Sequence, residues 1–256
     1  MREGPIVNDF NKTAEYIADG LVKTIENAFQ LCREAKALLD AGARARGLSL
    51  SVLAIEEIGK VFLIDGLVFS TVNDERALAF HEGFSKHKNK LEAAAAFPLA
   101  VPYFCRFESA GRDSKLLKEA CAIVLHNWSQ EKNRLMRMLG ESCSSTQWVA
   151  SFSKLNKYKQ AGFYVDNPEP GGFAAPEALS ADLSEAVYIV AWRMAELLHF
   201  IIGSDISVYR RWVESVRGKL SPAEALELRV AVTNAMQDLF DEAYEHVTRH
   251  DPDTIQ

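Results

Sequence analysis

The sequence predicts an all-α fold, a helical bundle with additional helices at its C-terminal end. Apolar residues recur at intervals of three and four along most of the 256 residues, and alternating strand-like runs are scarce. The composition is 48% apolar and 25% charged, which is typical of a globular protein with a substantial core. The net charge of −6 argues against coating nucleic acid by bulk charge, so an anionic partner would need a local basic patch.

The first half of the chain contains two long helical patterns. The first is expected over residues 13–41 and ends near Gly42. Its buried stripe would consist of Leu21, Ile25, Ala28, Cys32, Ala35 and Leu39. The second is expected over residues 49–70, capped by Ser49 or Ser51. Its inward-facing residues would be Val52, Ile55, Phe62 and Phe69.

Shorter and later elements follow. A helix is expected over residues 74–84, and residues 93–104 start as a helix that prolines at 98 and 102 interrupt. Further helices are expected over residues 114–139, 180–202, 205–219 and 222–250. The strongest loop signal is at residues 167–172, and Ser221 and Glu224 form a capping-box pattern. We expect residues 1–203 to form the bundle and residues 204–256 to be an extension packed on the same domain.

The cysteine and hydropathy patterns predict a cytoplasmic protein that does not cross a membrane. Four cysteines lie far apart with no C-x-x-C pair, and the N-terminus carries no signal-peptide pattern. Apolar runs are all shorter than the roughly 18 residues that span a bilayer. No metal-binding or phosphate-loop motif is present, so neither a metal nor a cofactor is expected.

Two acids and a lysine interrupt the apolar helical segment of residues 51–60. Glu56 and Lys60 are four apart, which would suit a surface ion pair, whereas Glu57 and Lys60 could instead frame a polar pocket. Gly59 lies inside this helix and predicts close packing against another element.

Two basic segments are candidate anion-binding sites. In the run of residues 84–91, lysines suit phosphate contact and His87 suits proton transfer, although a helix end solvated by lysines gives the same pattern. The second segment combines Lys154, Lys157 and Lys159 with Tyr158 and Tyr164, as in single-stranded RNA-binding surfaces or in an ordinary loop flank.

In these segments the chain resembles the AbiV family of abortive-infection proteins, which is placed near the HEPN helical superfamily. Three motifs carry the resemblance: Ala54-Ile-Glu-Glu-Ile-Gly-Lys60, Phe84-Ser-Lys-His-Lys-Asn-Lys90 and Lys159-Gln-Ala-Gly-Phe-Tyr-Val-Asp166, the last followed by Pro176. Asn27-Ala28 and Asp40-Ala41-Gly42 resemble the family's opening helix, and the likeness covers roughly residues 24–200. The resemblance implies phage defence, a homodimer, and metal-independent cleavage of RNA as in several HEPN relatives.

The resemblance implies specific roles for these residues. His87 would be the acid–base residue, Glu57 and Lys60 would orient the site, and Lys88 and Lys90 would contact phosphate. Lys159 and Tyr164 would contribute to substrate binding, with Tyr164 stacking or hydrogen bonding.

HEPN ribonucleases use Arg–His pairs, and two are present, Arg76 with His81 and Arg193 with His199. Neither coincides with the matched motifs, and His199 on an apolar helix is equally typical of a core or interface residue. Three functions therefore stay open: an endoribonuclease toxin, a non-enzymatic module that binds a phage or translation protein through its basic surface, and a purely structural bundle.

Overall fold

The computed structural model describes residues 14–69, 84–95, 97, 126–128, 130–140, 145–163, 180–203, 206–217 and parts of 221–231. Every regular element in these ranges is a helix, which confirms the all-α prediction. None of the described helices is long and apolar enough to cross a membrane. Of the helix predicted at residues 74–84, only residue 84 is described, and it is helical together with residue 85. The loop predicted at residues 167–172 lies outside the described residues.

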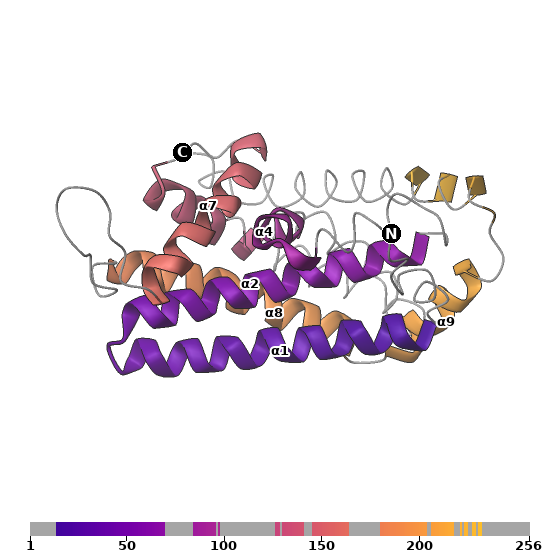
Figure 1. Cartoon of the computed structure of the whole chain (residues 1–256), viewed down its shortest axis with the longest axis horizontal. Helices are drawn as coiled ribbons and strands as arrows, with labels where there is room; N and C mark the ends of the chain where they lie inside the picture. The colour runs from indigo at the N-terminus through magenta and orange to yellow at the C-terminus, as the bar shows by residue number, and fades with distance from the viewer. Residues whose placement is uncertain are drawn as a thin grey trace, which may run out of the picture.

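Two long antiparallel helices form the base of the molecule (Figure 1). Helix α1 spans Ala14–Asp40 and α2 spans Arg44–Gly66. They are joined at Gly42, whose φ of 79° is a left-handed conformation that favours glycine at a helix end. The predicted stripe of α1 is buried from Leu21 to Ala35, whereas Leu39 is only half-buried. The prediction for the first helix is thus confirmed to within a residue at each end.

Helix α2 begins five residues earlier than predicted. Ser49 and Ser51 do not cap it but lie inside it, and their hydroxyls donate to the carbonyl oxygens of Ala45 and Gly47, four residues back. A serine can bond to its own helix in this way, so a serine alone does not mark a helix start. The helix ends in a short 3₁₀ turn, η2, at Leu67–Phe69.

Two helices lie across α2 on the side away from α1 (Figure 1): α4, His87–Ala94, and α7, Ser145–Phe163. They pack against α2 and against each other. The basic run was expected at or just past a helix end. Its basic residues, from Lys86 onward, follow the helical residues 84–85, but they also open α4, which was not predicted.

Helix α8, Ala181–Gly203, completes the core by packing against both α1 and α2. Ser180 caps it, since its hydroxyl accepts a hydrogen bond from the Leu183 N–H at 3.1 Å. Residues 126–128 and 130–138 are helical and end at Gly140, whose φ is 69°, as the sequence predicted.

The predicted C-terminal extension begins with α9, Ile206–Arg217, which packs against α1. The Tyr209 hydroxyl donates to an Asp65 carboxylate oxygen at 2.6 Å and so ties α9 to α2. Further on, the capping box forms: the Ser221 N–H donates to Glu224 at 2.7 Å and the Glu224 N–H to the Ser221 hydroxyl at 3.4 Å. The boundary at residue 203 stays a prediction.

Candidate functional site

A buried carboxylate on α2 forms the centre of the candidate site. Glu56 is 1% exposed, and side chains from two other helices surround its oxygens. Lys159 Nζ on α7 lies 2.5 Å from Oε1, while His87 Nδ1 and Lys90 Nζ, both on α4, lie 2.6 Å and 3.3 Å from Oε2. We call these four residues the Glu56 cluster. One acid thus connects α2, α4 and α7.

Two glycines let the backbones of α4 and α7 come close enough for these contacts. At Gly59 on α2, a Cβ atom would overlap the carbonyl oxygen of Lys90 and lie 2.7 Å from its carbonyl carbon. At Gly162 on α7, a Cβ atom would overlap the Ser49 hydroxyl and the Ala45 carbonyl oxygen. The close packing predicted at Gly59 is therefore confirmed, and the two glycines fix α4 and α7 against α2.

The Glu56 cluster favours the ionised form of its carboxylate. Burial by itself would raise the pKa of Glu56, because removal from water disfavours a charge. Hydrogen bonds from Lys159 and His87, together with the positive charges of Lys159 and Lys90, outweigh burial and lower the pKa below its usual 4.5. The two lysines and one ionised carboxylate together carry one excess positive charge, which suits an anionic ligand.

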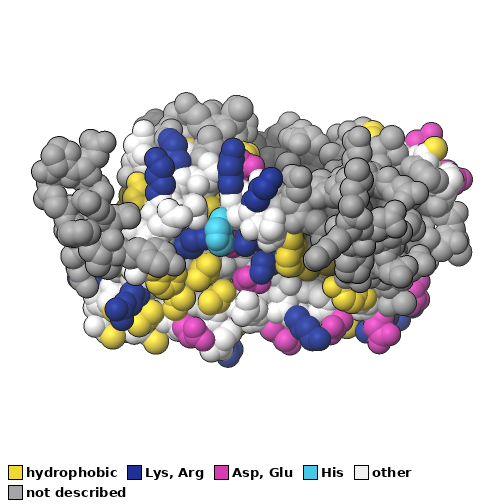
Figure 2. Space-filling view, viewed as in Figure 1, with side chains coloured by type: hydrophobic (Ala, Val, Ile, Leu, Met, Phe, Trp, Pro, Cys, Tyr) yellow, Lys and Arg dark blue, Asp and Glu magenta, His cyan; other side chains and the backbone are white. Residues whose placement is uncertain are grey.

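His87 is the member of the cluster that reaches the surface. Its side chain is 51% exposed, whereas those of Lys90 and Lys159 are below 10%. Figure 2 shows a histidine among lysine and arginine side chains on the face formed by α4 and α7. Since Nδ1 faces Glu56, Nε2 is the nitrogen available to a ligand.

The other predicted acid–lysine pair forms beside the cluster. Glu57 and Lys60 make an ion pair at 2.5 Å, and both side chains are less than 20% exposed. Lys60 Nζ also lies 5.1 Å from the centre of the Phe84 ring, within range of a cation–π interaction. Of the two alternatives that the sequence left open here, the surface pair between Glu56 and Lys60 does not form, because Glu56 points toward α4 and α7 and Lys60 pairs with Glu57.

The predicted phosphate-binding lysines differ sharply in exposure. Lys88 is 70% exposed and lies 3.6 Å from Glu92. By contrast, the ammonium groups of Lys90 and Lys159 contact Glu56 within the protein. Of these three lysines, only Lys88 stands open to a ligand. Tyr164 lies outside the described residues, as do Arg76 and His81.

The remaining Arg–His pair lies on a different face of the bundle. Arg193 pairs with Glu196 on α8 itself, at 3.0 Å. His199 packs its ring against Phe29 of α1, with ring centres 5.3 Å apart. The contact of His199 with Phe29 places this histidine where α8 meets α1, which we call the α1–α8 face, whereas the printed partner of Arg193 lies on α8 alone.

Glu56 is the site residue that sequence reasoning missed. Its i, i+4 spacing to Lys60 suited a surface pair, and Glu57 was the acid predicted to orient the site. The sequence did hold a signal: Gly59 predicts a close neighbour for this turn of α2. No sequence pattern indicated that this neighbour would be the helix that carries His87 and Lys90.

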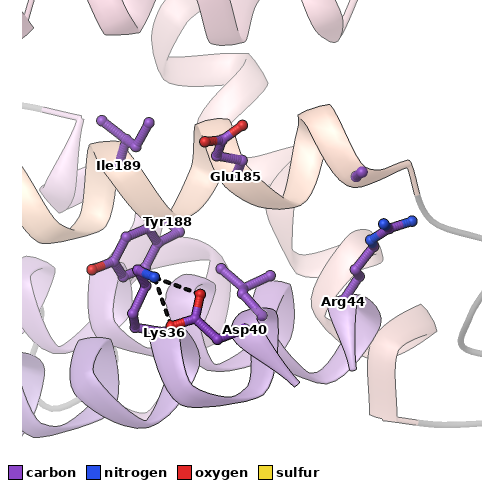
Figure 3. A pocket seen from close by; sticks show the side chains of 8 residues that line it. Lys36, Asp40, Arg44, Glu185, Tyr188 and Ile189 are labelled. Atoms are coloured by element: carbon purple, nitrogen blue, oxygen red, sulfur yellow. Dashed lines mark hydrogen bonds and ion pairs between the residues drawn. The ribbon is translucent and has the colours of Figure 1, made fainter. Parts of the chain in front are cut away.

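A hollow of about 260 Å³ lies away from the Glu56 cluster, between α1, the start of α2 and α8 (Figure 3). It is lined by two cations, Lys36 and Arg44, and by two acids, Asp40 and Glu185. Lys36 pairs with Asp40 at 2.5 Å and 2.7 Å, and Glu185 lies 3.7 Å from Arg134. Acids and bases are balanced around this hollow, so it shows no charge preference. Within the described part of the chain, no group of three His, Cys, Asp or Glu side chains could hold a metal ion.

Comparison with known proteins identifies the family. The model of the HEPN-type AbiV family matches residues 16–193, a range that holds all but the first two residues of α1, the helices α2, α4 and α7, and the whole Glu56 cluster. No curated protein and no solved structure matches the chain. The family match covers well over half of the 256 residues. The chain therefore belongs to the AbiV family of HEPN-type proteins, whose role is abortive infection in defence against phage.

Proposed function

We propose that the protein is a phage-defence toxin that cleaves RNA in the cytoplasm without a metal ion, with His87 as its acid–base residue. The observation that carries this proposal is the exposed imidazole held 2.6 Å from a buried carboxylate. A carboxylate paired with a histidine in this way is a common arrangement for general acid–base catalysis. His87 Nε2 would take the proton of a ribose 2′-hydroxyl. The 2′-oxygen would then bond to the adjacent phosphorus, and the bond from phosphorus to the 5′-oxygen would break. The products would be a 2′,3′-cyclic phosphate and a 5′-hydroxyl whose oxygen takes its proton from water.

The charge around His87 supports a polyanionic substrate. Exposed lysines lie on both helices that flank it, Lys86 and Lys88 on the α4 side and Lys154 and Lys157 on α7. Because the whole protein has a net charge of −6, these lysines would attract a polyanion only to the face around His87. Phosphates drawn there would lie within reach of His87, and the cluster's excess positive charge would stabilise the charge that develops on phosphorus.

We further propose that the protein acts as a homodimer through the α1–α8 face. Both helices carry aromatic side chains: Phe29 of α1 packs on Trp192 of α8 with ring centres 4.8 Å apart, and Phe200 on α8 is 49% exposed. Exposed aromatic residues are enriched in protein interfaces. Size-exclusion chromatography with light scattering should show a dimer that Phe200→Asp converts to a monomer. Phe163→Asp on α7 is the matched control, and a monomeric wild type would contradict this proposal.

The test of the ribonuclease activity is incubation of the purified protein with total RNA and tRNA in EDTA, followed by sizing of the products. We expect discrete fragments from the wild type and from His126→Ala, a histidine on another helix that bonds to Gln130. His87→Ala should give none. Loss of cleavage in His199→Ala alone would instead place the chemistry on the α1–α8 face.

The rival function is a non-enzymatic module that binds a phage protein or a translation component through the same lysines. It predicts intact RNA, a salt-sensitive complex weakened by Lys88→Glu, and a nearly silent His87→Gln. Intact RNA together with toxicity that survives in His87→Gln would favour the rival. Cleavage that depends on His87 would exclude it.

A further inference from the structure

We infer that Glu56 is the positioning residue of this site: it holds the ring proton of His87 on Nδ1 and so presents Nε2 to the substrate as the base. The catalytic consequence rests on the proposed function, whereas the state of the ring does not. Neither the AbiV family match nor the motif analysis gives Glu56 this role. It follows from the contacts of the carboxylate.

The first argument is the direction of the hydrogen bond. An ionised carboxylate can only accept hydrogen bonds, so at 2.6 Å the Nδ1 atom of His87 must carry the proton. The other nitrogen, Nε2, then holds the free electron pair whenever the ring is neutral. Because the ring is about half exposed, this nitrogen is accessible to a substrate hydroxyl.

The second argument is the rigidity of the acceptor. Lys159 holds Oε1 of Glu56 at 2.5 Å, and Lys90 lies 3.3 Å from the same Oε2 that accepts from His87. Both lysine ammonium groups are buried with the carboxylate. The carboxylate therefore cannot rotate away from the imidazole without losing a lysine contact. A fixed second-layer partner of this kind is how active sites hold a catalytic side chain in place.

The third argument is the charge state that the lysines impose. A protonated Glu56 would donate a hydrogen bond to Nδ1 and would leave the ring proton on Nε2, the wrong nitrogen for a base. Burial favours that protonated form, but Lys159 and Lys90 oppose it and lower the pKa of Glu56. Lys90 and Lys159 thus act through Glu56 rather than by touching phosphate, which changes the roles expected for them from the sequence.

The neighbouring acid supplies a matched comparison. Glu57 follows Glu56 in the same helix, but its carboxylate pairs with Lys60 at 2.5 Å. Glu56→Gln and Glu57→Gln each remove one negative charge, and the two changes lie at adjacent positions of α2. Only Glu56 contacts the imidazole, so only its replacement should change the state of the His87 ring.

The experiment uses nitrogen-15-labelled histidine in the full chain, with His87→Gln to identify the signals of His87. Spectra recorded at mildly alkaline pH report which ring nitrogen carries the proton. We expect Nδ1–H in the wild type and in Glu57→Gln. In Glu56→Gln with Lys159→Gln, which keeps the net charge of the cluster, the preference should be lost and RNA cleavage should fall by about 10²-fold or more.

Two results would overturn the inference. One is an Nε2–H ring in the wild type, which needs no variant and so stands even if the double variant fails to fold. The other is an unchanged Nδ1–H preference in a folded double variant. Failure of the proposed function looks different: His87 would hold its proton on Nδ1 in a Glu56-dependent way, while the wild type would leave every RNA intact.

Discussion

Gly59→Ala is the sharpest test of how the site is assembled. The change adds one methyl group to α2 at the point where α4 crosses it. That methyl group would overlap the Lys90 carbonyl oxygen and lie 2.7 Å from the carbonyl carbon. Both atoms belong to the backbone, so no side-chain rotation relieves the contact. Helix α4 itself has to move.

The size of the effect follows from these distances. The carbonyl carbon alone requires α4 to shift by about 0.7 Å, from 2.7 Å to the 3.4 Å where ordinary contact begins, and the overlapping carbonyl oxygen requires a larger shift. Overpacking of this kind typically costs about 1–3 kcal/mol, and a rigid backbone neighbour places Gly59→Ala at the upper end. Alanine returns about 1 kcal/mol through its helix preference. We therefore expect a net loss of about 2 kcal/mol.

Thermal unfolding followed by circular dichroism measures this loss. In a chain of this size, 2 kcal/mol lowers the Tm by about 4–8 °C. Gly66→Ala is the matched control, because it lies in the same helix and its Cβ would meet no atom within 4 Å. Gly66→Ala should match or slightly exceed the wild type. If Gly59→Ala were as stable as Gly66→Ala, the close contact between α2 and α4 would not exist.

Three further changes probe the same assembly by urea unfolding. Ser49→Ala removes the 2.8 Å hydrogen bond to the Lys159 carbonyl oxygen on α7 and should cost about 1 kcal/mol, whereas Ser51→Ala, which loses only a bond within α2, should cost less. Lys159→Ala leaves a buried carboxylate without its 2.5 Å partner and should cost about 3 kcal/mol, while the exposed Lys23→Ala should leave the midpoint unchanged. The pKa of Glu56 is lowered in the folded protein, so its contribution is complete above pH 4.5 and is lost as the pH falls through the lower folded value. The urea midpoint of the wild type should drop over that range more than that of Glu56→Gln; parallel curves would contradict this linkage.

Local sequence signals predicted α1, α8, α9 and most of α2, whereas α4 and α7 were not predicted as helices. The buried stripe of α1, its end at Gly42, the start of α8 near Ser180 and the Ser221–Glu224 capping box all depend on residues within one or two turns of each other. Interactions of this range are visible in the sequence. The start of α2 was misplaced because Ser49 bonds across to Lys159, 110 residues away, as well as within its own helix.

The candidate site shows the limit of such reasoning. Spacing along α4 predicts that His87 and Lys90, three apart, share a face. Spacing along α2 cannot say whether Glu56 or Glu57 meets that face, since adjacent residues differ by about 100° around a helix. The contact between helices decides it, and that contact is set by two glycines, Gly59 and Gly162, far apart in the chain. Glu56 is 31 residues from His87 and 103 residues from Lys159, so the packing of the helices, and not their spacing in the sequence, brings these side chains together.

This assembly separates the residue proposed for the chemistry from the residues that hold it. His87 is about half exposed, so its replacement removes one surface ring and leaves Glu56 with both lysines. Replacement of Glu56 or Lys159 leaves an uncompensated charge inside the protein. Loss of activity in His87→Ala at an unchanged Tm would therefore be a chemical effect. In Glu56 variants the same loss could come from unfolding, and only the protonation state of the His87 ring distinguishes the two causes.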